Sequence, residues 1–309
     1  MTDLTIEERA TWRHSDLGER FELALPEGRI DVFRRGAGEP IVFVHGVLVN
    51  ANLWRNVVPR LADEFQCTTL DLPLGSHARP LPDADLTLPG LARLVVGALE
   101  AMRVGPVTLV GNDSGGAVCQ LVAATRPDLI KRLVLTSCDA YENFPPPAFG
   151  FLKLLASTPG AVAALAAGLR LRAVQRLPIA YGWLTFRPID RDASDSYALP
   201  PSAVPGIRDD LRRLLRGLDK RHTLTAARSF AGFVRPVLLA WSADDRFFLP
   251  RYATRMAEDF PNARIEWIPD ARTLSPEDQP ALLATAISTF IGENPSALVR
   301  NPAPAREDA

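Results

Sequence analysis

The sequence predicts an α/β protein with a mostly parallel, doubly wound sheet and an inserted helical cap. Short, nearly continuous apolar runs alternate with longer segments of helical period, and a purely helical stretch then interrupts this alternation. Strands of a parallel sheet show such continuous runs because both faces of the sheet are covered. A length of 309 residues is sufficient for one large α/β domain with an insertion.

The composition excludes several classes of partner. The chain has 35 Lys and Arg against 36 Asp and Glu, so no overall field attracts nucleic acid or an anionic membrane surface. We expect neither partner, and we expect a monomer or homodimer that acts on a small-molecule substrate without a cofactor or metal.

The first nineteen residues contain no apolar signal segment, and the three cysteines lie apart in apolar surroundings. A cytoplasmic location is therefore expected.

The strand pattern begins with an antiparallel hairpin. Residues 21–25 and 30–34 flank a turn-forming cluster and predict its two strands. The strands of the parallel sheet are then predicted at residues 41–44, 67–72, 107–110, 133–136, 237–241 and 264–268. Helical segments that belong to the core are predicted at 88–102, 117–125 and 280–290.

The alternation stops after Ser137. Residues 144–226 have a helical period and are rich in Leu, Ala and Arg, which predicts a cap inserted between two parts of the core, 1–143 and 227–293. Residues 294–309 combine prolines with small and charged residues and are predicted to be a disordered tail.

A glycine-rich turn lies between a predicted strand and a predicted helix. Residues 111–116 read Gly-Asn-Asp-Ser-Gly-Gly, and a strained strand-to-helix turn needs small residues on both sides of its tip. This spacing places Asp113 at the tip and excludes Ser114. We expect Ser114 to contribute only its backbone N–H, at the helix N-terminus, to an oxyanion hole. A phosphate-binding loop or a plain turn is the alternative.

A second turn reads His45-Gly46-Val47 at the end of the first core strand, and Trp54 follows at a distance of nine residues from His45. Here the chain resembles the α/β-hydrolase superfamily. The resemblance covers most of the chain, and it implies that the backbone N–H of Val47 is the second oxyanion donor. For His45 itself, a structural histidine that binds the loop backbone is the preferred interpretation over a direct role in the site.

The resemblance also implies a partner carboxylate. Residues 241–246 look like the acid turn of the family, with the match on Asp245 and with Asp244 as an alternative one residue away. Asp139, directly after the strand at 133–137, stands where some dehalogenase-like relatives carry their acid. Each of these carboxylates could instead be a turn or N-cap residue.

An aspartate at the tip resembles the haloalkane dehalogenase and epoxide hydrolase branch of this superfamily. In that branch the aspartate attacks a saturated carbon, and a water activated by histidine cleaves the resulting ester. The resemblance therefore implies hydrolysis of an epoxide, carbon–halogen or ester bond in a small, largely apolar substrate.

One residue of the family pattern is missing. The histidine is expected in the loop at 268–280, but Thr273 stands at the aligned position, and the four histidines of the chain all lie elsewhere. Threonine cannot accept a proton near neutral pH. The tryptophan that often follows the nucleophile in dehalogenases is also replaced, by Ser114, so efficient dehalogenation is not expected.

Three interpretations follow. In the first, the enzyme is a hydrolase with a relocated base, His77 or His222. In the second, Asp113 acts as an acid or base in a dry pocket and catalyses a lyase, isomerase or cyclase reaction that needs no histidine. In the third, the protein is catalytically inactive and binds a small apolar ligand beneath the cap.

Overall fold

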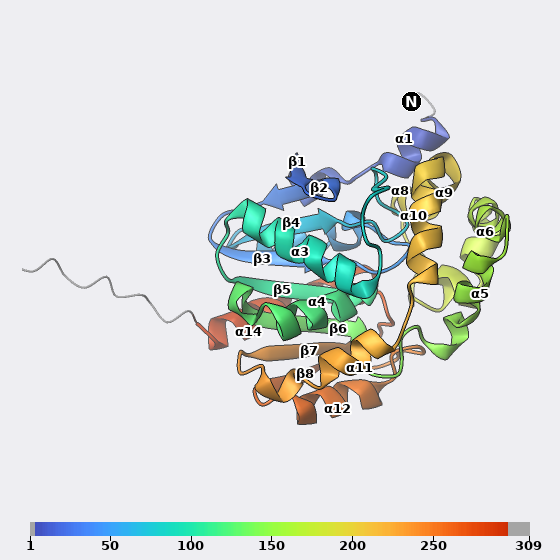
Figure 1. Ribbon diagram of the computed structural model, residues 1–309. Helices are drawn as coiled ribbons and strands as arrows, with labels where there is room; N and C mark the ends of the chain where they lie inside the picture. The colour runs from blue at the N-terminus through green and yellow to red at the C-terminus, as the bar shows by residue number, and fades with distance from the viewer. Residues whose placement is uncertain (1–3, 296–309) are drawn as a thin grey trace, which may run out of the picture.

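The computed structural model describes residues 4–295 and has one eight-stranded sheet (Figure 1). The strand order is β1-β2-β4-β3-β5-β6-β7-β8. β1 pairs antiparallel with β2, β2 pairs antiparallel with β4, and all other pairs are parallel. The predicted fold class is confirmed. The strands are β1 (Glu19–Leu25), β2 (Gly28–Arg35), β3 (Glu39–Val44), β4 (Phe65–Asp71), β5 (Val107–Asp113), β6 (Ile130–Cys138), β7 (Val237–Ser242) and β8 (Ala263–Ile268).

The hairpin and every predicted strand are present, but β5 and β6 extend beyond their apolar runs. Polar residues at their carboxyl ends continue the pairing, as where Asn112 pairs with Thr136. The amide of Asn112 also donates to the side-chain and backbone oxygens of Thr136, at 2.8 and 3.1 Å. A strand end that is paired through polar side chains is invisible to a search for apolar runs.

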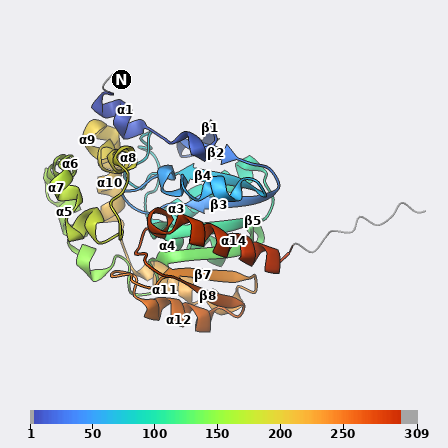
Figure 2. The same cartoon turned by 180° about the vertical axis from the view of Figure 1, so that it is seen from behind.

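Helices cover both faces of the sheet. On the face seen in Figure 1 lie α3 (Leu88–Met102), α4 (Ser114–Thr125) and α12 (Pro250–Asp259), and their apolar residues form one core cluster with that face. On the face seen in Figure 2 lies α14 (Pro280–Glu293), which contacts α2 (Val58–Leu61) and completes a second cluster. The predicted doubly wound arrangement follows from these two layers.

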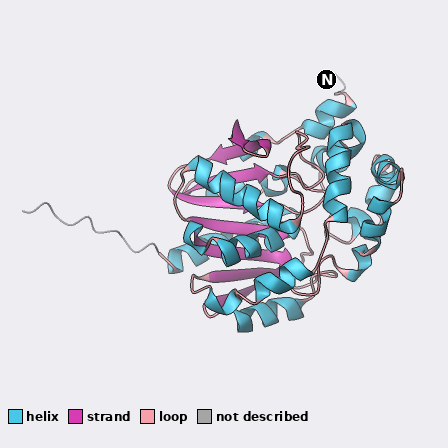
Figure 3. Cartoon of the chain, in the orientation of Figure 1, coloured by secondary structure: helices cyan, strands magenta, loops and turns pink. Residues whose placement is uncertain are grey.

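The segment between β6 and β7 is helical, as predicted, and lies beyond the carboxyl ends of the central strands (Figure 3). Its helices are α5 (Phe151–Ser157), α6 (Ala161–Leu169), α7 (Arg172–Gln175), η5 (Pro178–Gly182), α8 (Arg191–Ala198), α9 (Pro200–Ala203), α10 (Pro205–Arg216) and α11 (Arg221–Ala227). α11 contacts the core helix α4. The division at residues 144 and 226 stays a prediction, and most of the predicted tail, 296–309, lies outside the described residues.

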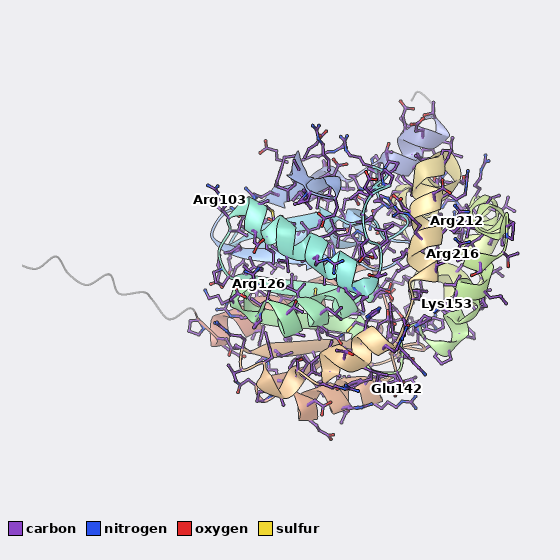
Figure 4. The ribbon with its side chains drawn as sticks, viewed as in Figure 1. Arg103, Arg126, Glu142, Lys153, Arg212 and Arg216 are labelled. Carbon is purple, nitrogen blue, oxygen red and sulfur yellow. The ribbon has the colours of Figure 1, made fainter. Side chains whose placement is uncertain are left out.

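Different hydrogen bonds hold the inner and the outer helices of this segment. Inner helix α8 is held by the core: the amides of Asn50 and Asn52 donate to Ser196, each at 2.8 Å, and the hydroxyl of Ser76 donates to the backbone oxygen of Tyr197 at 2.6 Å. Outer helix α5 is held by α10 and the residues after it (Figure 4): Arg216 donates to Ala156 O at 2.9 Å, and Lys153 donates to Leu218 O at 3.1 Å. In residues 4–295 no helix is long and apolar enough to cross a bilayer.

Candidate active site

Asp113 occupies a strained turn at the junction of β5 and α4. Its φ is 54° and its ψ is −132°, a conformation that non-glycine residues rarely adopt. The chain can turn so sharply because the neighbouring glycines lie against backbone and side-chain atoms. A Cβ at Gly115 would lie 2.4 Å from the backbone oxygen of His45, and one at Gly116 would lie 2.3 Å from Cys138 Cβ.

One oxygen of Asp113 is held by backbone donors. Val47 N–H donates to Oδ2 at 3.1 Å. The backbone of Ser114 donates a second hydrogen bond to the same carboxyl group. Gly46 makes this approach possible, since a Cβ there would lie 2.0 Å from Oδ2. The two expected oxyanion donors therefore both serve the carboxylate itself.

His45 supports this turn and does not reach the cavity. Leu72 N–H donates to its Nε2 at 3.0 Å, so the proton resides on Nδ1, which donates to Gly46 O at 2.9 Å. Burial lowers the pKa of His45 to about 4, so the ring is neutral near pH 7. His45 is the structural histidine that the sequence favours.

Asp139 lies beside Asp113 at the end of the neighbouring strand. Both residues line the same cavity, and the hydroxyl of Ser114 donates to Asp139 Oδ2 at 2.8 Å. The other oxygen, Oδ1, is buried and has no hydrogen-bond partner in the described part of the chain. Ser114 thus contacts the site through its hydroxyl as well as its backbone, and the expectation that only its backbone is used stays a prediction.

Asp245 and Thr273 meet at the same edge of the sheet. Asp245 Oδ1 accepts from the backbone N–H groups of Phe247 and Phe248 at 2.8 and 2.9 Å. It also accepts from Thr273 Oγ1 at 3.2 Å. Asp244, by contrast, is exposed to solvent. Thus the structure brings Asp245 and Thr273 together, while Asp244 points away.

The protonation of the three carboxyl groups differs from that of exposed aspartates. Burial, together with the nearby charge of Asp245, raises the pKa of Asp113 to about 7. Burial raises the pKa of Asp245 to about 6. Burial and the charge of Asp113 raise the pKa of Asp139 well above its usual value. The neighbouring carboxyl groups of Asp113 and Asp139 therefore retain a proton to a higher pH than exposed aspartates do.

The cavity in front of Asp113 has a volume of about 180 Å³. Apart from Asp113, Ser114 and Asp139, its described lining consists of apolar residues and Tyr181, and it contains no Lys, Arg or His side chain. For comparison, an apolar cavity of about 150 Å³ holds a benzene molecule. The space therefore fits a small, largely apolar molecule with its reactive atom against the carboxyl groups.

The two histidines proposed as relocated bases lie elsewhere. His77 is buried, and its Nε2 is 3.0 Å from Asp210 Oδ2 on α10. His222 lies on α11, which contacts α4. Neither residue lines the cavity in front of Asp113. The structure thus gives no support to a base at either position.

We expect Ser114→Ala to lower kcat by about 10-fold, because the variant removes a hydrogen bond worth roughly 1–2 kcal/mol from a buried acid. Steady-state kinetics beside the exposed-helix control Ser157→Ala would measure this loss. A rate as low as that of a variant at Asp113 would instead identify Ser114 as the nucleophile. An unchanged rate would restore the backbone-only role.

Comparisons with known proteins agree with this architecture. Residues 39–280 match the family model described as alpha/beta hydrolase fold. The chain is 26% identical to the uncharacterized hydrolase YugF of Bacillus subtilis, over 82% of this chain and 90% of that protein. It is also 26% identical to haloalkane dehalogenase 2 of Mycobacterium bovis, over 86% of this chain and 92% of the relative. The crystal structure of an alpha/beta hydrolase fold protein from Burkholderia ambifaria superimposes with a TM-score of 0.76 at 25% identity, covering 88% of this chain and 97% of that one.

Proposed function

The chain belongs to the alpha/beta hydrolase fold family, and on this basis we propose that it adds water to a small apolar epoxide, with Asp113 as base and Asp139 as acid. One observation carries the proposal: two neighbouring carboxyl groups, Asp113 and Asp139, line one apolar cavity, and burial raises the pKa of both, so that one proton can be shared between a base and an acid. Pairs of carboxyl groups whose surroundings separate their pKa values are the usual signature of an acid and its base. No histidine is needed for such a pair.

The reaction proceeds in one step and balances. Ionised Asp113 removes a proton from a water molecule, whose oxygen attacks a ring carbon. The carbon–oxygen bond of the ring breaks, and the departing oxygen takes the proton of Asp139. The product is a diol, and one proton has to pass from Asp113 to Asp139 to restore the starting state. The free oxygen of Asp139, which has no other partner in the described residues, is the atom suited to carry that proton.

An epoxide fits these groups better than a halide or an ester. An epoxide oxygen leaves as an alkoxide and needs an acid, whereas a halide leaves as a stable anion that needs N–H donors. Apart from the two carboxyl groups, the described lining residues offer only two side-chain donors, the hydroxyl groups of Ser114 and Tyr181. The hydroxyl of Tyr181 already donates to Leu48 O at 2.7 Å. The relative named a haloalkane dehalogenase makes a carbon–halogen bond the alternative substrate.

A second mechanism has its own support. Because backbone N–H groups of Val47 and Ser114 hold the carboxyl group of Asp113, that group is positioned to attack a carbon directly, and an ester carbonyl would then occupy the same donors. Cleavage of that ester needs a base, and Thr273 stands beside Asp245 where the family resemblance places one. The same pair of carboxyl groups could also isomerise a substrate without water, and an inactive ligand-binding protein would show neither reaction.

Labelled water distinguishes these possibilities. The protein is incubated with small epoxides such as styrene oxide in H₂¹⁸O, first with enzyme in excess and then over many turnovers. Direct addition of water places one ¹⁸O in the diol of the first turnover and leaves the peptide that contains Asp113 unlabelled.

An ester mechanism gives the opposite pattern. The first diol then carries an oxygen from Asp113, and ¹⁸O accumulates in the Asp113 peptide or an adduct persists on it. An isomerised product without added oxygen would show that the enzyme catalyses isomerisation by proton transfer and not hydration. Absence of any product and any adduct with the whole panel would overturn the proposed enzyme and favour a ligand-binding protein.

A further inference from the structure

The exposed apolar side chains of this protein are concentrated on one segment. Among residues 4–295, eleven large hydrophobic side chains are exposed, and seven of them lie between residues 151 and 186. Six of these seven form what we call the apolar rim: Phe151, Leu154, Leu171, Leu177, Ile179 and Trp183. Leu154 and Leu171 are the most open, with 73% and 61% of their surface exposed. A soluble monomer does not normally gather such residues on one segment unless the surface binds something.

Half of the apolar rim lines the cavity of the candidate site. Phe151, Leu177 and Ile179 are exposed to solvent and also line that cavity. Trp183 is linked to it through Phe247, whose ring centroid lies 6.4 Å from that of Trp183 and 4.8 Å from that of Phe149, another lining residue. In Figure 1 the outer helices α5 and α6 lie at the edge of the molecule that is remote from the sheet. The mouth of the cavity thus opens among the most exposed apolar residues.

The charge of the same segment is entirely positive. Residues 151–189 contain one Lys and four Arg and no Asp or Glu, whereas the whole chain is balanced. Arg170, Arg176 and Arg187 are exposed, and their side chains make no ion pair or hydrogen bond within the described residues. The balanced net charge of the whole chain predicts no membrane partner. That net charge, however, is an average over this positive segment and the acidic remainder of the chain. The segment that carries the apolar rim therefore also carries an excess of unpaired arginines, and it combines the two attractions that anionic bilayers offer.

We propose that the apolar rim binds the surface of an anionic lipid bilayer and that the substrate enters the cavity from the lipid phase. A second copy of the chain is a poorer occupant, because two copies of residues 151–189 would bring like charges together, and these residues include no carboxylate to pair them. An apolar molecule also concentrates in lipid, so a cavity mouth at the bilayer surface meets its substrate at higher concentration. The inference goes beyond the proposed reaction and does not depend on it, since binding is measured without turnover.

Vesicle binding tests the proposal. Purified protein is floated with vesicles of phosphatidylcholine and phosphatidylglycerol in a 3:1 ratio, and with vesicles of phosphatidylcholine alone. We expect binding to the anionic vesicles, weaker binding at high salt, and a shift of tryptophan emission to shorter wavelength. That shift should vanish in Trp183→Phe and persist in Trp267→Phe, because Trp267 is equally exposed but lies on β8.

Matched substitutions separate the two attractions. Leu154→Glu with Leu171→Glu should lower the partition coefficient at least 10-fold, whereas Leu282→Glu, at an exposed position of α14, should leave it unchanged. Changing Arg170, Arg176 and Arg187 to Gln should lower it by about 100-fold, since each arginine contributes roughly 5-fold. No binding to anionic vesicles, or equal loss in Leu282→Glu, would overturn the proposal. A dimer that the Leu154 and Leu171 changes dissociate, without vesicle binding, would assign the rim to self-association instead.

Discussion

Asp113→Asn is expected to lower kcat/KM for epoxide hydration by about 1000-fold or more, the largest effect of any single change in this site. The amide oxygen can still accept from Val47 N–H, so the turn and the oxyanion donors are retained, but the side chain can no longer accept a proton. An ester mechanism requires the same loss, because an amide is a poor nucleophile. Steady-state kinetics on the most reactive epoxide of the panel would measure it.

The control for this variant is Asp244→Asn, since Asp244 is an exposed carboxylate in the acid turn and should be dispensable. Circular dichroism would verify the fold of both variants. Intact mass would show that no carboxylate has been regenerated by deamidation. Undiminished turnover in Asp113→Asn would remove this residue from the chemistry altogether.

The second large effect concerns stability. Relative to the wild type, Asp113→Asn should be more stable at pH 8, by about 2–4 kcal/mol, and nearly equal in stability at pH 4. The cause is burial, which raises the pKa of Asp113 to about 7 in the folded chain from its ordinary value of 3.8. At a pH between these two pKa values, Asp113 is ionised in the unfolded chain but protonated in the folded chain. The folded wild type therefore loses stability as the pH rises through this range.

The difference between variant and wild type reports Asp113 together with the carboxyl groups coupled to it, because carboxylates elsewhere with lowered pKa values, such as Asp71, contribute equally in both proteins. Urea unfolding at a series of pH values would give the free energies of unfolding. Asp244→Asn again serves as the control and should show no such trend. A difference that does not change between pH 4 and pH 8 would mean that Asp113 is not buried as a carboxylate.

Local sequence was sufficient to predict the framework of the site. The glycines at 111, 115 and 116 predicted Asp113 as the tip residue, because a turn with its tip there leaves no room for a Cβ on either side. In the structure a Cβ at any of these glycines would lie within 3 Å of neighbouring atoms. The order of strands and helices predicted that residues at the ends of successive strands meet at one edge. For the same reason Asp245 and Thr273 are adjacent, although 28 residues separate them.

Contacts between distant side chains were not predictable. The hydrogen bond from Ser114 to Asp139 depends on the rotamers of two residues on neighbouring elements, and no spacing rule encodes it. His77 was placed near the pocket because its loop follows β4, but Asp210 on α10 binds its Nε2. The exposure of the apolar rim depends on how the inserted helices pack, which a helical period does not reveal. Helix α1 (Ile6–Thr11), for which no element was predicted, contacts α8 and α9.

The different hydrogen bonds that hold the inner and the outer helices of the helical segment give it two local stabilities. Inner helix α8 shares buried amides and hydroxyls with the core through Ser196, so its opening requires the loss of core contacts. Outer helix α5 is attached to α10, at Ala156, and is otherwise largely exposed. Cooperative subunits within a fold separate where such couplings are weakest. We therefore expect the outer helix α5 to exchange its amide hydrogens before α8 and the sheet do, which hydrogen-exchange mass spectrometry would measure.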